Sequence, residues 1–343
     1  MKKADYWVKK QGGVLCELCP RYCLIKEGSY GYCNARANVS GTLRSIVYGN
    51  PTGFQVDPIE KKPFYHFNPG ARVYSFGTMG CNMRCRYCCN WFYSQEKPVK
   101  QAAAIAPSKI IKAAIDNHCH GIAYTYNEPS VFFEYARDTA KAANDKGLFN
   151  LFVTNGLINE KPLADIDDYL DAVVIDFKGF NEKFYLEYTG AKLDWVKQSV
   201  KYYKKLRAWK EVTNLVVPGL NDSTDDITSL VKFIKQVLGV NTPIHFIRFF
   251  PLYKATNIPY TPEQVLKRCY DIAKDQGMNY VYIGNDASRD DTHCPKCGSL
   301  LIKRSGLRLI KSYLKGKKCP KCGFSVPIIG NIHEGTFNYP NFG

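Results

Sequence analysis

The chain has 343 residues, of which 45% are hydrophobic, so it can bury one large α/β core with small appendages and is not disordered throughout. It has no run of about eighteen apolar residues and no apolar segment after the charged residues 1–6, so neither a transmembrane helix nor a secretory signal is predicted. The net charge of +16 admits nucleic acid, an acidic protein or an anionic substrate as a partner, but lysines on predicted helix faces supply much of it and favour solvated surface.

Cysteine is the most informative residue type in this chain. Most of the fourteen cysteines lie in C-x2-C or C-x3-C clusters, which in a chain of this size indicate metal sites rather than a disulfide framework. Cys119 and Cys269 stand alone in helical patterns, where a buried thiol is expected. This usage predicts a reducing, cytoplasmic location.

Residues 1–70 form an N-terminal cysteine-rich section. Cys16, Cys19, Cys23 and Cys33 follow the spacing C-x2-C-x3-C-x9-C. Four thiolates can complete a Zn²⁺ site or hold a second Fe–S cluster, and the spacing does not decide between them. Zinc is slightly favoured because no reaction step yet requires a second cluster. Proline and glycine then predict an ordered loop over residues 57–70.

A second cysteine motif follows at residues 80–91 (GCNMRCRYCCNW). Cys81, Cys85 and Cys88 have the spacing C-x3-C-x2-C, with Tyr87 just before the third cysteine. Three thiolates at this spacing can hold a [4Fe–4S] cluster and leave one of its four irons without a protein ligand. A small molecule can bind that iron and receive an electron from the cluster.

Residues 71–286 alternate short β-rich runs with helical patterns, which predicts a parallel sheet. Strands are predicted at residues 72–76, 121–125, 148–154, 172–177, 211–217, 244–250 and 280–283. Helices are predicted at residues 108–117, 129–145, 162–170, 193–206, 224–238 and 262–276. The predicted fold class is therefore α/β, a partial (β/α)6-type TIM barrel, and its chemistry is expected at the carboxyl ends of the strands. Polar turns follow several strands there, at residues 124–129, 153–156 and 176–178.

Residues 287–343 form the third predicted section, a zinc-ribbon-like module. Two C-P-x-C-G sequences supply Cys294, Cys297, Cys319 and Cys322, which predict one structural Zn²⁺ site. Between them, residues 303–318 contain seven basic residues and no acidic one, the best nucleic-acid signal in the chain, with solubility or protein docking as comparable explanations.

Three sequence blocks now point to a known family. Residues 16–23 (CELCPRYC), 57–63 (DPIEKKP) and 77–82 (GTMGCN) resemble the AmmeMemoRadiSam-system radical S-adenosylmethionine (SAM) enzymes, which belong with the pyruvate formate-lyase activating enzyme-like proteins. Residues 124–129, 214–223 and 245–254 and the C-terminal cysteine pairs extend the resemblance over most of the chain.

The resemblance implies a catalytic [4Fe–4S] cluster on Cys81, Cys85 and Cys88. It also implies SAM contacts from the following residues: Tyr87, Asn127, Glu128, Thr154, Asn155, Asp176 and Lys178. Val153 stands where the activases have an acidic residue, and Cys89 stands where glutamine is more usual in the immediate family.

The implied reaction is reductive cleavage of SAM to methionine and a 5′-deoxyadenosyl radical, which abstracts hydrogen from a substrate. The implied partners are a reductant such as ferredoxin or flavodoxin and the Memo-like and AMMECR-like proteins, with no membrane. Activation of a glycyl-radical enzyme and modification of RNA, docked through the basic zinc ribbon, are alternatives. A metal-rich scaffold or electron-transfer protein that binds no SAM is the non-catalytic alternative.

Overall fold

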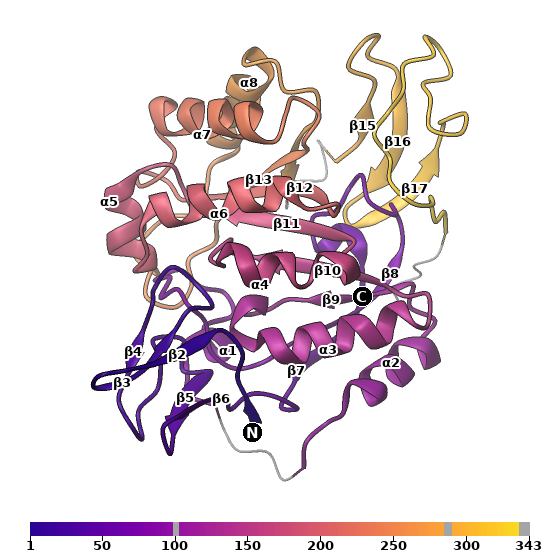
Figure 1. Cartoon of the computed structure of the whole chain (residues 1–343). Helices are drawn as coiled ribbons and strands as arrows, with labels where there is room; N and C mark the ends of the chain where they lie inside the picture. The colour runs from indigo at the N-terminus through magenta and orange to yellow at the C-terminus, as the bar shows by residue number, and fades with distance from the viewer. Residues whose placement is uncertain (99–102, 285–289, 336–343) are drawn as a thin grey trace.

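The computed structural model describes residues 1–98, 103–284 and 290–335. Its centre is one eight-stranded sheet in the order β14-β13-β12-β11-β10-β9-β8-β7 (Figure 1). The strands from β8 to β14 pair in parallel, and β7 pairs antiparallel with β8. Their bounds are β7 Thr52–Pro58, β8 Arg72–Gly77, β9 Gly121–Tyr124, β10 Phe149–Thr154, β11 Ala172–Phe177, β12 Trp209–Val216, β13 Ile244–Arg248 and β14 Val281–Gly284. Because β14 and β7 are the two edges of the described sheet, the barrel is incomplete.

The sheet is buried on both faces, and this explains the apolar sequences of its strands. Every residue of β9 (GIAY) and β14 (VYIG) is buried, as parallel strands covered on both sides require. Helices cover the outer face (Figure 1). They are α2 Pro107–Asp116, α3 Phe133–Asn144, α4 Glu160–Ala164, α6 Leu193–Lys205, α7 Thr224–Val237 and α8 Glu263–Asp275. All seven predicted strands are confirmed, with ends that move by at most two residues.

Local chemistry fixes several of the helix ends. Pro107 is the first residue of α2, where its missing N–H costs nothing, and the Ser223 hydroxyl accepts the Asp226 N–H to cap α7. The helix predicted over residues 129–145 begins as the short helix η2 (Pro129–Phe132) before α3. The one predicted over residues 162–170 is divided into α4 and η3 (Asp167–Tyr169). Further short helices are η1 Ile59–Lys61, α1 Trp91–Gln95, α5 Glu182–Phe184 and η4 Tyr185–Thr189.

The N-terminal section contains two small antiparallel sheets. One has the order β1-β6-β5 and the other β2-β3-β4. Their bounds are β1 Lys2–Lys3, β2 Trp7–Lys10, β3 Gly13–Cys16, β4 Leu24–Ile25, β5 Arg36–Val39 and β6 Thr42–Ser45. The central sheet already begins at β7, within the predicted residues 1–70, so the boundary at residue 71 remains a proposal.

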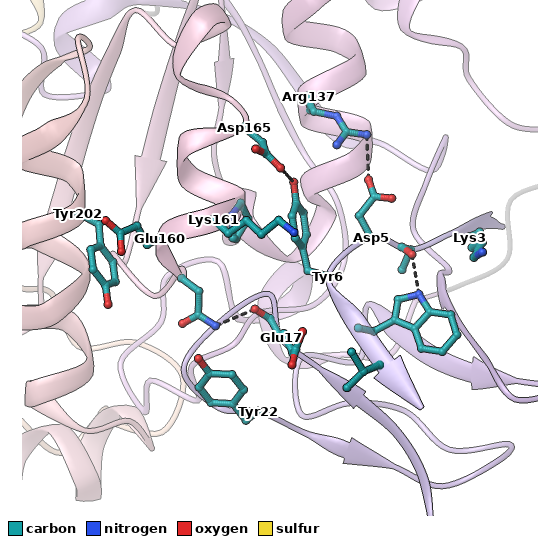
Figure 2. Close-up of a pocket in the computed structure, with 15 residues that line it drawn as sticks. Lys3, Asp5, Tyr6, Glu17, Tyr22, Arg137, Glu160, Lys161, Asp165 and Tyr202 are labelled. Carbon is teal, nitrogen blue, oxygen red and sulfur yellow. Dashed lines mark hydrogen bonds and ion pairs between the residues drawn. The ribbon is translucent and has the colours of Figure 1, made fainter. Parts of the chain in front are cut away.

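Polar contacts attach these small sheets to α3 and to the segment that follows α4 (Figure 2). Arg137 forms an ion pair with Asp5 at 2.9 Å, and the Tyr6 hydroxyl donates to Asp165 Oδ2 at 2.6 Å. The same surface is an open hollow of about 940 Å³ with polar walls, and its lining includes no cysteine. We therefore interpret it as a junction between two parts of the fold and not as a reaction site.

The C-terminal section is a three-stranded antiparallel sheet of β15 (Thr292–His293), β16 (Leu300–Ser305) and β17 (Arg308–Ser312). It packs on Tyr65 and Tyr282 through Leu301 and Ile302. Since Tyr282 is the second residue of β14, this section covers the amino end of the central sheet, at the far side of the molecule from β2 and β3 (Figure 1). The predicted boundary between residues 286 and 287 and the last residues, 336–343, lie outside the described residues. In the described part of the chain, every helix is too short or too polar to cross a membrane.

Candidate active site inside the barrel

One cavity of about 550 Å³ runs through the barrel from the carboxyl ends of the strands toward their amino ends. We call the end of the cavity at the carboxyl ends of the strands its upper end and the opposite end its lower end, whatever the orientation of a figure. Cys81, Cys85 and Cys88 line the upper end. Glu60, Tyr65, His245 and Asp290 line its lower end, together with Gly306 and Leu307 from the turn between β16 and β17. The cavity is therefore bounded by the cysteine loop at one end and by the C-terminal section at the other.

The cysteine loop, residues 80–91, is held by backbone hydrogen bonds from both sides. The Arg84 N–H donates to Thr189 O at 2.7 Å, and the Arg86 N–H donates to Tyr188 O at 2.9 Å. The Gly80 N–H donates to Tyr93 O at 2.7 Å, which turns the loop back toward α1. Cys81 and Cys85 are buried and Cys88 is half-buried, so solvent has little access to the three thiols.

The arrangement of these three thiols fits a polynuclear cluster. In the described parts of the chain, the only group of three or more metal-binding side chains with ligand atoms all within 4.8 Å is the C-terminal cysteine set. The Cys81, Cys85 and Cys88 sulfurs do not form such a compact group, and ligands of different irons in one cluster are likewise farther apart than ligands of a single ion. Soft thiolates are also the ligands that Fe–S clusters require.

Two asparagine side chains from neighbouring strand ends fix the start of the cysteine loop. Asn127, after β9, donates to Gly80 O at 2.7 Å and to Thr78 Oγ1 at 3.1 Å. Asn155, after β10, donates to Asn82 Oδ1 at 2.8 Å, and its Nδ2 lies 3.6 Å from Cys81 Sγ. Both also line the cavity, so these predicted SAM contacts orient the loop as well as facing the ligand space.

Glu128 lies behind this wall and is hydrogen-bonded to Thr154, which is part of it. The buried Glu128 carboxylate accepts the Asn155 N–H at 2.7 Å, the Thr154 hydroxyl at 2.8 Å and the Ser130 N–H at 3.0 Å. Burial raises the pKa of Glu128, while the hydrogen bonds act in the opposite direction. Thr154 is among the residues that line the cavity and Glu128 is not. The geometry gives Glu128 a positioning task, because its carboxylate joins the ends of β9 and β10.

Asp176 and Lys178, at the end of β11, form an ion pair inside the cavity. Thr213 Oγ1 donates to Asp176 Oδ1 at 3.1 Å and fixes the carboxylate. Burial acts to lower the pKa of Lys178, but the charges of Asp176 and Cys85 outweigh it and raise that pKa above its ordinary value. Lys178 is therefore a cation at neutral pH, close to the cysteine loop.

Tyr87 and Cys89 lie on either side of Cys88 and also line the cavity. The buried Tyr87 ring stacks on Phe184 with centroids 5.9 Å apart and meets the edge of Phe249. The Cys89 side chain is exposed at the upper rim.

The C-terminal cysteines form a compact set. Cys294 Sγ lies 3.5 Å from Cys322 Sγ, and Cys297 Sγ lies 3.6 Å from Cys319 Sγ. Four sulfurs this close suit one tetrahedral ion. In the basic segment between the pairs, Arg304 is buried and Lys303 forms an ion pair with Asp291. These two cations therefore make contacts within the chain.

Two residues that were not predicted as site residues, Glu60 and His245, line the lower end of the cavity and pair with buried charges behind it. Glu211 in β12 accepts from His245 Nε2 at 2.8 Å and from the His66 N–H at 2.9 Å. Glu60 lies 3.7 Å from Arg304, and both are fully buried. A signal existed in the sequence, since a glutamate and a histidine inside predicted strands of a buried sheet need polar partners.

Comparisons with known proteins agree with this site. Residues 76–234 match the model of the Radical SAM superfamily. The chain is 41% identical over 335 residues to an uncharacterized protein of Methanocaldococcus jannaschii, an alignment that covers 96% of this chain and 100% of that protein. It is 23% identical over 214 residues to the pyruvate formate-lyase-activating enzyme of Staphylococcus epidermidis, covering 57% of this chain and 83% of that enzyme. A crystal structure of Streptococcus suis SuiB has a similar fold, with a TM-score of 0.50 at 16% identity over 62% of this chain and 49% of SuiB.

The fold and the cysteine loop thus define a radical SAM enzyme with a partial barrel. The chain belongs to the radical SAM superfamily and, within it, to the same family as the M. jannaschii protein. Its more distant relatives include pyruvate formate-lyase-activating enzymes. Membership implies a [4Fe–4S] cluster and SAM as cofactors.

Proposed function

We propose that Cys81, Cys85 and Cys88 hold the catalytic cluster and that the barrel cavity holds SAM and the substrate. When bound there, the reduced cluster would supply the electron that cleaves SAM, and the resulting 5′-deoxyadenosyl radical would take hydrogen from the substrate. The observation that supports this most strongly is the convergence of three thiols and the polar strand ends on one cavity.

The chain's own residues would bind and orient the cofactor. Lys178 offers a fixed cation to the SAM carboxylate, and a charge-assisted hydrogen bond is stronger than a neutral one. Asn127, Asn155 and Thr154 offer neutral polar groups, and Tyr87 offers an aromatic edge for the adenine. The C-terminal section closes the lower end, which limits the access of water and oxygen to reactive species.

The proposal is tested by anaerobic reconstitution of the full chain with iron, sulfide, SAM and dithionite, followed by measurement of 5′-deoxyadenosine. The wild type is expected to release it, and Cys81→Ala, Cys85→Ala and Cys88→Ala are expected to release none. Cys269→Ala, which removes a buried thiol of α8 outside the cavity, is the matched control and is expected to retain the reaction. A fully loaded wild type without product, or product from the three cysteine variants, would overturn the proposal.

The substrate is proposed to be acted on together with Memo-like and AMMECR-like proteins, with ferredoxin or flavodoxin as the reductant. The similarity to the S. epidermidis activase supports a second candidate, the activation of a glycyl-radical enzyme. The exposed cations of the segment 303–318, such as Arg308 and Lys311, give RNA weaker support, because Lys303 and Arg304 serve the fold. Transfer of deuterium from labelled candidate substrates into 5′-deoxyadenosine, measured with and without each partner, separates the three candidates.

A further inference from the structure

The four N-terminal cysteines enclose a small cavity of their own. Cys16, Cys19, Cys23 and Cys33 all line it, and its volume of about 20 Å³ leaves room for at least one water-sized sphere between them. Leu18, Ile25 and Val131 supply the remaining apolar wall, and each of these side chains is at most 2% exposed. Four thiols around one small cavity are expected to hold a bound group.

The distances between these four sulfurs differ from the distances within the C-terminal set. A tetrahedral zinc ion with Zn–S bonds of about 2.3 Å brings its sulfurs to about 3.8 Å from one another. The C-terminal sulfurs approach this spacing, with pairs at 3.5 and 3.6 Å. Within the described residues only that set has its ligand atoms all within 4.8 Å, so the sulfurs of Cys16, Cys19, Cys23 and Cys33 are more widely dispersed. The chain therefore contains one set of four cysteines whose sulfurs are close enough to bind a single ion, and a second set whose sulfurs lie farther apart.

A buried cation lies against the N-terminal set. Arg36 is only 1% exposed, and its Nη1 lies 3.6 Å from Cys16 Sγ and donates to Asp5 O at 2.9 Å. Its Nη2 forms an ion pair with the buried Glu134 of α3. A guanidinium beside a cysteine sulfur stabilises the thiolate and the net negative charge of a thiolate-bound cluster.

The N-terminal set is also packed directly against the radical SAM cysteine loop. Asn82, the residue after Cys81, lines the N-terminal cavity, and Arg21 Nε donates to Asn82 O at 2.5 Å. Gly80 lies against Cys33 O, where a side chain would clash. The two cysteine sites therefore share a wall.

We propose that Cys16, Cys19, Cys23 and Cys33 ligate a second iron–sulfur cluster of the [4Fe–4S] type in place of a single zinc ion. The sulfur spacing supports this assignment over zinc. The Arg36 contact suits the negative charge that four thiolates give to either group. It does not depend on the proposed function, because the four ligands and the cavity are separate from Cys81, Cys85 and Cys88.

The test uses the full chain with Cys81→Ala, Cys85→Ala and Cys88→Ala combined, which removes the ligands of the catalytic cluster. After anaerobic purification we expect about four irons and about four sulfides per chain, a Mössbauer spectrum of a [4Fe–4S] cluster and an EPR signal after reduction. We also expect about one zinc, in the C-terminal set. About two zinc ions without iron, or one zinc and no metal in the N-terminal set, would overturn the proposal.

A second measurement keeps the test decisive if the triple variant does not fold. The wild type is expected to contain about eight irons, and Cys19→Ser combined with Cys23→Ser is expected to contain about four. The matched control is Cys119→Ser combined with Cys269→Ser, two buried thiols outside both cavities, which is expected to keep about eight. A wild type with about four irons and two zinc ions contradicts the proposal, and this outcome leaves the radical SAM function untouched.

Discussion

Lys178 illustrates how a single side chain can be prepared for one ligand. It is a half-buried cation whose charge is balanced by Asp176, and Asp176 is itself fixed by the Thr213 hydroxyl. Such a cation is oriented before the ligand arrives, so little conformational entropy is lost on binding.

Lys178→Gln is expected to weaken SAM binding by about tenfold to a hundredfold, because one hydrogen bond to a charged group is lost. Equilibrium binding of SAM to the anaerobically reconstituted protein measures this effect. Lys205→Gln is the control. Lys205 lies on the surface of α6 and forms an ion pair with Glu160 of α4, outside the cavity. Equal SAM affinity in Lys178→Gln and the wild type would exclude Lys178 from the binding site.

His66, unlike Lys178, is kept uncharged by its buried surroundings. Its Nδ1 lies 3.2 Å from Pro327 O, which can only accept, so Nδ1 carries the proton and Nε2 accepts from the Tyr282 hydroxyl at 2.7 Å. Burial lowers the pKa of His66 to about 4, although the nearby Glu211 charge opposes this.

This shift predicts a loss of stability in acid. In the unfolded chain His66 takes up a proton near pH 6.5, whereas in the folded chain it does so only near pH 4. Between these values only the unfolded state gains the proton, so the free energy of unfolding falls as the pH is lowered, by up to about 3 kcal/mol. Thermal melts should therefore show that the difference in Tm between the wild type and His66→Gln decreases from pH 7 to pH 4. Parallel pH profiles of the two proteins would contradict this prediction.

At the scale of elements, the cysteine loop depends on its contact with the N-terminal section. Gly80 has φ of +95°, and a Cβ at this position would lie well inside van der Waals contact with Cys33 O. The backbone of Cys33 is fixed by its own section, so the clash cannot be relieved by a side-chain rotation.

Gly80→Ala is expected to destabilise the protein by about 2–4 kcal/mol through left-handed strain and this backbone clash. Gly147→Ala is the matched control: its φ is +70° and nothing lies within 4 Å of the added Cβ, so a cost of about 1 kcal/mol is expected. Thermal melts and the iron content of both variants measure the difference. Similar Tm values for the two variants would show that the two cysteine segments are not tightly packed.

At the scale of the whole molecule, Arg304 attaches the C-terminal section to the barrel. Its guanidinium donates to Tyr65 O at 2.8 Å, to Asp290 O at 2.9 Å and to Thr292 Oγ1 at 2.8 Å. It also lies over the Tyr65 ring and 3.7 Å from Glu60. One buried side chain thus connects the residues that close the lower end of the cavity.

Arg304→Met is expected to cost about 3–5 kcal/mol, because it leaves Glu60 buried without its cation. Burial raises the pKa of Glu60 to about 7, so part of the cost is relieved when Glu60 takes up a proton in acid. Adding Glu60→Gln to Arg304→Met should recover part of the stability, as measured by Tm at pH 8. Hydrogen exchange should show increased opening of β15–β17 in the single variant and unchanged protection of β9–β12. No change in either measurement would mean that the module is held by its apolar contacts alone.

The sequence determined the features that depend on neighbouring residues in the chain. The alternation of apolar runs and amphipathic segments predicted the seven parallel strands, because a strand buried on both faces must be apolar along its length. The C-x3-C-x2-C spacing brought three thiols into one short loop, and the two C-P-x-C-G sequences predicted a compact cysteine set. Each of these features is fixed by local geometry.

Only the tertiary structure decided which distant segments meet. Spacing could not distinguish zinc from a cluster at Cys16, Cys19, Cys23 and Cys33, since their separation also depends on how β3, β4 and β5 pack. It could not place Glu128 behind the cavity wall or Arg304 beneath the barrel, because both positions are set by contacts between residues far apart in sequence. The physical reason is that the folding of the whole chain, and not any one segment, fixes the burial of a charge and the distance between two loops.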